Sequence, residues 1–207
     1  MEEKLRQLIC EIGKLLYEKN LVVANDGNIS VRTGDGFLCS PTGVSKGLMT
    51  PEMICKLDKD GNSLDDNKVS SEFKMHLRVY EKREDVNAVV HAHPPYATTY
   101  AIANEPLDRP ITAEAIVAIG KVPVAPYGTP STIEIPNNIE PLLKDNNAIL
   151  LANHGALTYG GDLRQAFMRM ETIEFYAREM FQAELLGRAR ELNAEELSKL
   201  KRLSKPY

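Results

Sequence analysis

The segment Val86-Asn-Ala-Val-Val-His-Ala-His-Pro94 joins a short run of strand-forming residues to two histidines that are two positions apart. Pro94 and Pro95 stop a strand, so both histidines are expected at its carboxyl end. Side chains alternate between the two faces of a strand, and His91 and His93 therefore point the same way. The pattern predicts a pair of imidazoles on one face of a buried strand.

A third histidine, His154, follows a second apolar run that begins at Ala148. The chain has four histidines in all, and three of them end or follow apolar strands in this way. Catalytic zinc sites commonly use three protein nitrogens and leave one position open for water or substrate. A lone histidine is more often hydrogen-bonded to backbone in a core, but the pair together with His154 favours a metal site.

Length and composition are typical of a single globular domain spanning residues 1–207. The formal net charge of −4, with both signs interspersed, argues against a nucleic-acid binder or a membrane-surface protein. No apolar run approaches the ~20 residues that cross a bilayer, and the first residues show no signal-peptide pattern. Cys10, Cys39 and Cys55 lack a Cys-x-x-Cys spacing, which predicts reduced thiols in a cytoplasmic protein.

Two kinds of periodicity divide the chain into helices and strands. Helical spacing and capping residues predict helices over residues 2–19, 70–82, 96–103, 139–143 and 162–189, and a last short one after Asn193. Alternating or β-branched runs predict a hairpin over 25–40, strands over 54–58 and 86–93 and from 148, and two short strands within 111–125, broken near Gly120. This mixture favours one α/β domain around a largely antiparallel sheet.

Three short polar segments have the composition of an anion site. Ser70-Ser71-Glu72 resembles a helix amino terminus, whose free N–H groups and positive dipole end suit a phosphate. Gly27-Asn28 and Thr42-Gly43 are further donor-rich turns. Each segment alone is also explained by capping or an ordinary turn. Together they predict a phosphate pocket of backbone and hydroxyl donors, without an obligatory lysine.

Glu72 is the candidate for proton transfer. At the start of a helix its carboxylate is within reach of both a phosphate and a metal, and it is placed to move a proton at a carbon that the metal activates. Taken alone, it is a favourable charge at a helix amino terminus. His76 is four residues later on the same helical face, and a structural hydrogen bond is its preferred interpretation.

Five ordered motifs resemble the class II aldolase/adducin family, and the resemblance covers nearly the whole chain. They are Gly27-Asn-Ile-Ser-Val-Arg32, Ser40-Pro-Thr-Gly43, Ser70-Ser-Glu72, Val89-Val-His-Ala-His93 and Asn153-His-Gly155. The resemblance implies an α/β/α domain assembled as a cyclic homotetramer, with active sites between subunits.

The resemblance also implies roles for residues of this chain. His91, His93 and His154 would hold Zn²⁺, or Co²⁺, Mn²⁺ or another divalent metal, and Glu72 would approach the metal when substrate is absent. The positions that match the family's phosphate contacts are Gly27, Asn28, Thr42, Gly43, Ser70 and Ser71. The implied reaction is reversible cleavage of a sugar phosphate, a ketose 1-phosphate such as L-fuculose 1-phosphate or a related deoxyketose phosphate. Its products would be dihydroxyacetone phosphate and a short aldehyde such as lactaldehyde.

Two other functions occur among proteins that resemble this chain. L-Ribulose-5-phosphate 4-epimerases use the same metal and enediolate chemistry, but they carry Asp where this chain has Glu72. Adducin-like interaction modules keep the fold without the metal ligands, whereas all three histidines are present here. The aldolase is therefore favoured, with the epimerase and the interaction module as alternatives.

Three positions bear on the aldehyde end of the substrate. Glu114 stands where the ketose 1-phosphate aldolases carry a tyrosine, and the loop Gly128-Thr-Pro-Ser131 lacks their aromatic residue. Tyr207, the last residue, corresponds to a tyrosine of their carboxyl-terminal tail and is predicted to donate a proton or hydrogen bond to the aldehyde oxygen. A frayed terminus is the alternative for Tyr207. The identity of the aldehyde is left open.

Overall fold

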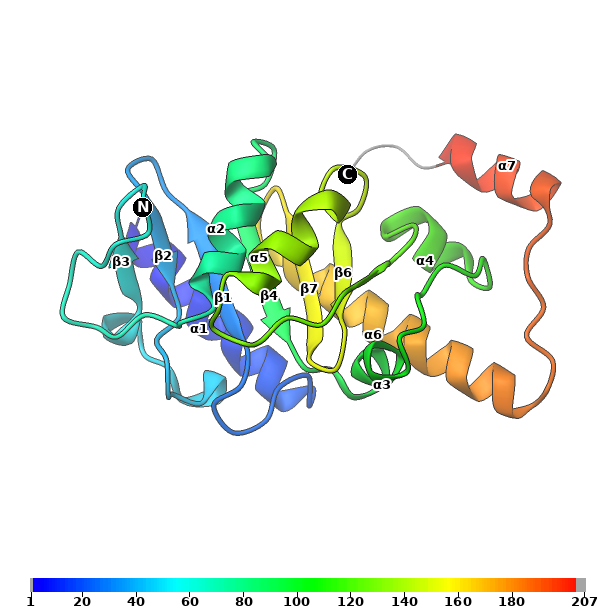
Figure 1. Ribbon diagram of the computed structural model, residues 1–207, viewed down its shortest axis with the longest axis horizontal. Helices are drawn as coiled ribbons and strands as arrows, with labels where there is room; N and C mark the ends of the chain where they lie inside the picture. Colours follow the sequence, from blue (N-terminus) through cyan, green and yellow to red (C-terminus); the bar gives the residue numbers. More distant parts are fainter. Residues whose placement is uncertain (1, 204–207) are drawn as a thin grey trace.

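The computed structural model of the protein describes residues 2–203 and is built on a seven-stranded sheet in the order β3-β2-β1-β4-β7-β6-β5 (Figure 1). Each neighbouring pair is antiparallel except β5 with β6, so the predicted largely antiparallel sheet is confirmed. The strands are β1 (Asn28–Arg32), β2 (Phe37–Cys39), β3 (Cys55–Leu57), β4 (Ala88–Ala92), β5 (Val124–Ala125), β6 (Ala148–Leu151) and β7 (Gly155–Gly160).

Helices cover both faces of the sheet and make an α/β/α arrangement (Figure 1). One face carries α1 (Glu2–Glu18), α3 (Pro95–Ala103), α4 (Ala113–Ala118) and α6 (Leu163–Leu185). The other face carries α2 (Phe73–Lys82) and α5 (Glu134–Ile139). Short 3₁₀ turns occur at η1 (Lys46–Leu48), η2 (Pro51–Met53) and η3 (Glu140–Leu142).

Alternation along β4 decides which layer each side chain enters. Val90 belongs to the core under α1 and α6, whereas Val89 belongs to the core under α2 and α5. His91 is two residues after Val89 and therefore points toward α2. The site thus forms on the α2 face, at the end of a fully buried central strand.

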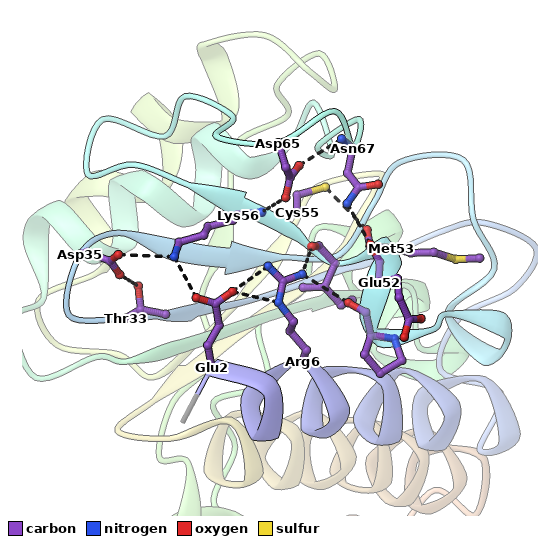
Figure 2. Close-up of polar contacts among 12 residues, drawn as sticks. Glu2, Arg6, Thr33, Asp35, Glu52, Met53, Cys55, Lys56, Asp65 and Asn67 are labelled. Atoms are coloured by element: carbon purple, nitrogen blue, oxygen red, sulfur yellow. Dashed lines mark hydrogen bonds and ion pairs between the residues drawn. The ribbon is translucent and has the colours of Figure 1, made fainter.

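The first turn of α1 is attached to the β3 edge of the sheet by a polar network (Figure 2). Arg6 donates to the main-chain oxygens of Ile54 and Pro51, and Lys56 donates to Glu2 at 2.8 Å. Hydrogen bonds from Lys56 and Arg6 lower the pKa of Glu2. These pairs are only partly buried and contribute modest stability, so they orient α1, while its buried apolar face supplies most of the attachment.

The segment 111–125 differs from its prediction. The sequence pattern predicts two short strands, but Ala113–Ala118 form helix α4 and only Val124–Ala125 form a strand. Alanine has the highest helix propensity, and α4 packs the buried Ala115 toward α6, so the helix outweighs the strand preference of the neighbouring β-branched residues. The break near Gly120 is present, with φ of 78°.

The chain leaves α6 through an extended segment and ends its described part in α7 (Ala194–Leu203), beside α4 (Figure 1). Asn193 Oδ1 accepts from the N–H groups of Glu195 and Glu196, while the Glu196 carboxylate accepts from the Asn193 N–H. This reciprocal cap is the one predicted from the sequence. Among the described residues there is no helix with both the length and the apolar character needed to cross a membrane.

Candidate active site

The three histidines singled out in the sequence meet at one point of the fold. His91 is in β4, His93 follows that strand, and His154 is in the turn between β6 and β7. Because β4 pairs with β7, the two segments lie side by side although 61 or more residues separate them along the chain. One ring nitrogen from each histidine lies within 4.8 Å of the others, and the ring centroids are 4.8–5.0 Å apart.

The turn that presents His154 is shaped by the residues around it. Asn153 has φ of 55°, in the left-handed region that asparagine tolerates well. A Cβ at Gly155 would lie 2.5 Å from Cδ2 of His93 and 2.6 Å from the oxygen of Ala92. The Asn-His-Gly sequence therefore permits a close approach of His154 to the end of β4 that a larger residue at position 155 would block.

Hydrogen bonds to the Nδ1 atoms indicate the tautomers of two rings. His91 Nδ1 lies 3.0 Å from the carbonyl oxygen of Ala156, and His93 Nδ1 lies 3.2 Å from Oδ2 of Asp26. A carbonyl and a carboxylate only accept, so each Nδ1 carries a hydrogen and Nε2 is the nitrogen that each ring turns toward the site. The two Nε2 atoms are 3.1 Å apart, a repulsive arrangement of lone pairs unless a cation lies between them.

The donor set fits a divalent metal. Burial, followed by the electrostatic interaction with the neighbouring His93 and His154 rings, lowers the pKa of His91 well below its usual value. Burial also lowers the pKa of His154, although Glu72 opposes it. Neutral imidazoles are the form that binds metal. Two nitrogens bound to one tetrahedral zinc ion at about 2.0–2.1 Å lie about 3.3–3.4 Å apart, close to the 3.1 Å between the His91 and His93 Nε2 atoms.

Glu72 faces the same point from the position just before α2. Its Oε2 is 3.5 Å from His91 Nε2, and its Oε1 is 3.3 Å from His154 Nε2. Asn28, opposite His91 in the β1–β4 pair, donates from Nδ2 to Oε2 at 2.9 Å. Oε1 is buried and accepts no hydrogen bond within the described part of the chain. The carboxylate is therefore held on one side by Asn28 and is available on the other to a cation or a proton.

His76 lies one turn below Glu72 and is part of the support of α2. Its Nδ1 is 2.7 Å from the Ser30 hydroxyl, which also lies 2.8 Å from the Tyr80 hydroxyl. All three residues are buried, and burial lowers the pKa of His76 to about 3. The hydrogen bond to β1 supports the structural interpretation of His76.

His76→Gln is expected to reduce the loss of folding stability that accompanies a fall in pH. The folded-state pKa of about 3 lies below the ordinary 6.5, so between these values the unfolded chain binds a proton that the folded chain does not. Stability therefore falls as the pH decreases below 6.5, and His76 accounts for about 2 kcal/mol of loss between about pH 7 and pH 5. Urea unfolding at both pH values measures it. The same loss in wild type and variant would contradict this assignment.

The predicted phosphate-binding residues lie at the start of β1, in the turn that follows β2 and just before α2. An isolated bridge pairs Pro41 with Val69, which places the turn that carries Thr42 and Gly43 beside the approach to α2. Ser70 is buried, and its hydroxyl accepts from the Glu72 N–H at 3.4 Å. Gly27 and Gly43 have positive φ values of 74° and 72°. A Cβ at Gly43 would meet nothing within 4 Å, so this backbone borders open space.

Not all of the predicted donors are free. The Thr42 N–H already donates to the oxygen of Lys68 at 2.9 Å, which leaves its hydroxyl. The Ser71 hydroxyl is exposed and 2.7 Å from that of Ser131. The loop 128–131 therefore lies next to the pocket, and its Gly128 lines a small recess together with His154. Its expected place near the aldehyde end of a substrate stays a prediction.

Sequence reasoning missed Asp26 and Lys46, which contact His93 and Val44, and it did not anticipate the contact of Ser131 with Ser71. No local pattern marks these contacts, although Asp26 stands directly before the recognised Gly27-Asn28 motif. Glu114 is exposed on α4 and lines a surface cavity of about 580 Å³ together with residues of α6. None of the described residues that line this cavity is a site histidine. Tyr207 lies outside the described residues.

Residues 7–181 match the sequence profile of the Class II Aldolase and Adducin N-terminal domain. The chain belongs to this family. The resemblance carried by the five sequence motifs is thereby confirmed. The family is typically metal-dependent, in agreement with the histidine cluster of this member.

Named relatives within the aldolase and adducin family have more than one activity. The chain is 35% identical over 168 residues to L-fuculose phosphate aldolase of Methanococcus maripaludis, covering 81% of this chain and 91% of that protein. It is 34% identical to 5-deoxy-D-ribulose 1-phosphate aldolase of Bacillus thuringiensis, with 99% and 97% covered. It is 33% identical to 3-oxo-tetronate 4-phosphate decarboxylase of Escherichia coli, with 97% of each chain covered.

The solved structures that resemble this chain are likewise described with more than one activity. YgbL of Escherichia coli, whose description offers aldolase, epimerase or decarboxylase, superposes with a TM-score of 0.91 at 31% identity, covering 97% of this chain and 99% of that one. A structure of L-fuculose 1-phosphate aldolase gives a TM-score of 0.88 at 32% identity, covering 97% and 95%. The fold is therefore that of the class II aldolases, and the relatives point to a sugar-phosphate lyase without defining its substrate.

Proposed function

We propose that the protein is a zinc-dependent aldolase that reversibly cleaves a ketose 1-phosphate to dihydroxyacetone phosphate and a short aldehyde. L-Fuculose 1-phosphate or a related deoxyketose phosphate is the proposed substrate. The observation that carries the proposal is the convergence of Glu72 with three histidine nitrogens beside donor-rich turns. The relatives named as aldolases of two such substrates support it.

The metal would be held by His91, His93 and His154. The Nδ1–H groups of His91 and His93 fix the orientation of those two rings. Ala156 and Asp26 accept from the Nδ1–H groups of His91 and His93, which directs each Nε2 into the site and raises its basicity. The bound metal would supply positive charge that stabilises the enediolate left when the carbon–carbon bond breaks. Zinc is preferred, although imidazole ligands also accept cobalt and other divalent ions.

Glu72 is the proposed acid and base. In cleavage, the bond between C3 and C4 of the ketose breaks, its electron pair stays on C3, and the C4 hydroxyl passes its proton to Tyr207 or to solvent as it becomes the aldehyde carbonyl. Glu72 then delivers a proton to C3, which completes dihydroxyacetone phosphate, and it removes the same proton in the reverse direction. Asn28 orients the carboxylate by its hydrogen bond to Oε2. Tyr207 remains the proposed partner of the aldehyde oxygen.

The phosphate is proposed to bind the turns that carry Gly27, Asn28, Thr42, Gly43, Ser70 and Ser71. It does not react, so its binding energy positions the carbon that does. Backbone N–H groups at the start of α2, with the hydroxyls of the two serines, suit a dianion. This arrangement accounts for a preference for phosphorylated sugars.

Ser71→Ala is expected to raise KM for the phosphorylated substrate roughly tenfold, because a hydrogen bond to a charged group contributes about 1.5–3 kcal/mol. Metal content and kcat should stay near those of the wild type. Steady-state kinetics and metal analysis measure the two effects. Ser63→Ala, at an exposed serine of the turn after β3, is the control. An unchanged KM would show that Ser71 does not bind the phosphate.

Decarboxylation of a 3-oxo acid phosphate is the second candidate, favoured by the relative with that activity that matches 97% of this chain. A 3-oxo-tetronate 4-phosphate that loses its carboxylate as carbon dioxide leaves the same enediolate of dihydroxyacetone phosphate. The site residues would then serve both reactions, and only the group that leaves differs. None of the three relatives named above is called an epimerase, although the description of YgbL includes that activity.

A panel of ketose phosphates and 3-oxo acid phosphates tests the proposal. Aldol cleavage releases dihydroxyacetone phosphate with an aldehyde, decarboxylation releases it with carbon dioxide, and epimerisation releases none. Aldehyde release from a ketose 1-phosphate is the expected result. Release of carbon dioxide without any aldehyde would show that the activity is decarboxylation and not aldol cleavage.

We also propose a cytoplasmic homotetramer with active sites between subunits. Exposed apolar side chains on and after α6, including Met168, Phe175, Leu185 and Leu186, support association. Light scattering in solution measures the mass, and a stable monomer of 23.1 kDa would overturn the tetramer.

A further inference from the structure

Lys46 is a lysine in the interior of the protein, with only 1% of its surface exposed. Its Nζ donates to the carbonyl oxygen of Val44 at 2.8 Å and to that of Asn25 at 3.2 Å. Both partners are neutral, and among residues 2–203 no carboxylate oxygen lies within 4.0 Å of Nζ. A buried ammonium group without a paired carboxylate is costly, so its presence calls for a counter-charge from elsewhere.

The fold brings Lys46 to this position by a close approach of η1 to α1. A Cβ at Gly13 would lie 2.8 Å from the main-chain oxygen of Lys46 and 2.3 Å from the Met49 side chain. Glycine at position 13 of the helix therefore lets the η1 turn lie against α1. The Lys46 side chain is buried there, with Nζ against the carbonyl oxygens of Asn25 and Val44.

The two carbonyl partners of Lys46 belong to the two turns that carry most of the proposed phosphate donors. Asn25 directly precedes Asp26-Gly27-Asn28, and Val44 directly follows Thr42-Gly43. One ammonium group thus joins both turns. A lysine ammonium has three N–H donors, and the two carbonyls use two of them, which leaves one for a further acceptor.

Asp26 is the acidic group that acts on Lys46 electrostatically. Burial lowers the pKa of Lys46, and electrostatic interactions with the Cys39 thiol and the Asp26 carboxylate oppose that effect. Asp26 accepts from His93 Nδ1, so its charge is already engaged at the metal side of the site. The turn 25–28 therefore contacts Lys46 through Asn25, His93 through Asp26, and Glu72 through Asn28.

We propose that Lys46 is the buried positive charge of the phosphate pocket. It holds the turns 25–28 and 42–44 together and attracts the phosphate dianion of the substrate, which becomes its counter-charge. The inference rests on the proposed function in taking a phosphorylated sugar as the ligand. It goes beyond the sequence-based expectation, in which backbone and hydroxyl groups bind the phosphate without an obligatory lysine.

Binding of inorganic phosphate to the metal-loaded protein tests the inference without any turnover. Lys46→Met and Lys46→Gln both remove the charge, and the glutamine also keeps donors for the two carbonyls. Both variants are expected to bind phosphate about 10- to 100-fold more weakly than the wild type, while their affinity for metal is unchanged. Isothermal titration with phosphate, and separately with Zn²⁺, measures the two affinities.

Lys68→Met is the matched control. Lys68 is exposed, and its main-chain oxygen accepts from the Thr42 N–H, so it lies next to the same turn without being buried. This variant should bind phosphate as the wild type does. If Lys46→Met folds poorly by circular dichroism, the comparison of Lys46→Gln with Lys68→Met carries the test.

Wild-type phosphate affinity in a folded Lys46→Gln protein would overturn the inference, and so would an equal loss in Lys68→Met. A wild-type protein that binds no phosphate would overturn it as well. The result is independent of the reaction. If the substrate panel shows no aldol cleavage but phosphate binding still requires Lys46, the proposed activity fails and the lysine assignment stands.

Discussion

Replacing Glu72 by glutamine is expected to lower kcat for aldol cleavage by about 10²–10⁴-fold while the fold and the metal remain. Glutamine has the same shape, and its amide oxygen can accept from Asn28 Nδ2 as the carboxylate does. It cannot carry the proton between solvent and C3. The buried position of the carboxylate, with 16% of the side chain exposed, limits replacement by water.

Two measurements separate the proton-transfer role from general damage. Steady-state kinetics give kcat, and exchange of the C3 hydrogen of dihydroxyacetone phosphate in D₂O, without aldehyde, reports the proton step alone. Both should fall together in Glu72→Gln. Glu52→Gln is the matched control, because Glu52 is an exposed glutamate in the first turn of η2. Exchange at the wild-type rate in Glu72→Gln would assign the step to another group.

Removal of the metal is expected to abolish turnover, and one equivalent of a divalent ion per chain should restore it. The reason is the arrangement of His91, His93 and His154, each of which places one ring nitrogen at a common point beside Glu72. Without the cation, nothing in this cluster neutralises the charge that develops on the substrate oxygens. Dialysis against a chelator, metal analysis and reconstitution with Zn²⁺, Co²⁺ or Mn²⁺ measure the effect.

The thermal stability of the protein gives a second measurement of the effect of metal removal. A ligand that binds only the folded state at 100 times its Kd stabilises it by about 2.7 kcal/mol, so the metal-free protein should melt at a lower temperature. His93→Ala should lose both the metal and this shift. His76→Gln should keep them, because His76 contacts Ser30 instead of the histidine cluster. Full activity in metal-free protein would contradict the role of the metal.

Much of the site is predictable from local sequence because each signal is contained in a few consecutive residues. The alternation of side chains places His91 and His93 on one face, and Pro94 ends the strand there. The Asn-His-Gly motif reflects a turn with φ of 55° at Asn153 and space needed at Gly155. These requirements involve the backbone itself, and few residue types satisfy them.

Segment 111–125 shows where local signals are insufficient. Its β-branched residues indicate strands, its alanines indicate a helix, and the two preferences are similar in size. Contacts of α4 with α6 and α7 select the helix. Such contacts depend on how distant parts of the chain pack, so the pattern within the segment does not contain them.

Strand periodicity and the order of the motifs are enough to indicate the α/β class and to single out the three histidines and Glu72. The contacts that tune these groups join residues far apart in the chain: Asp26 to His93 over 67 positions, and Ser71 to Ser131 over 60. Lys46 reaches Asn25 across 21 positions because Gly13 lets η1 lie against α1. A side chain's capacity to act as a ligand follows from its chemistry, which the sequence displays. Its protonation, charge balance and neighbours follow from burial and strand pairing, which exist only in the folded chain.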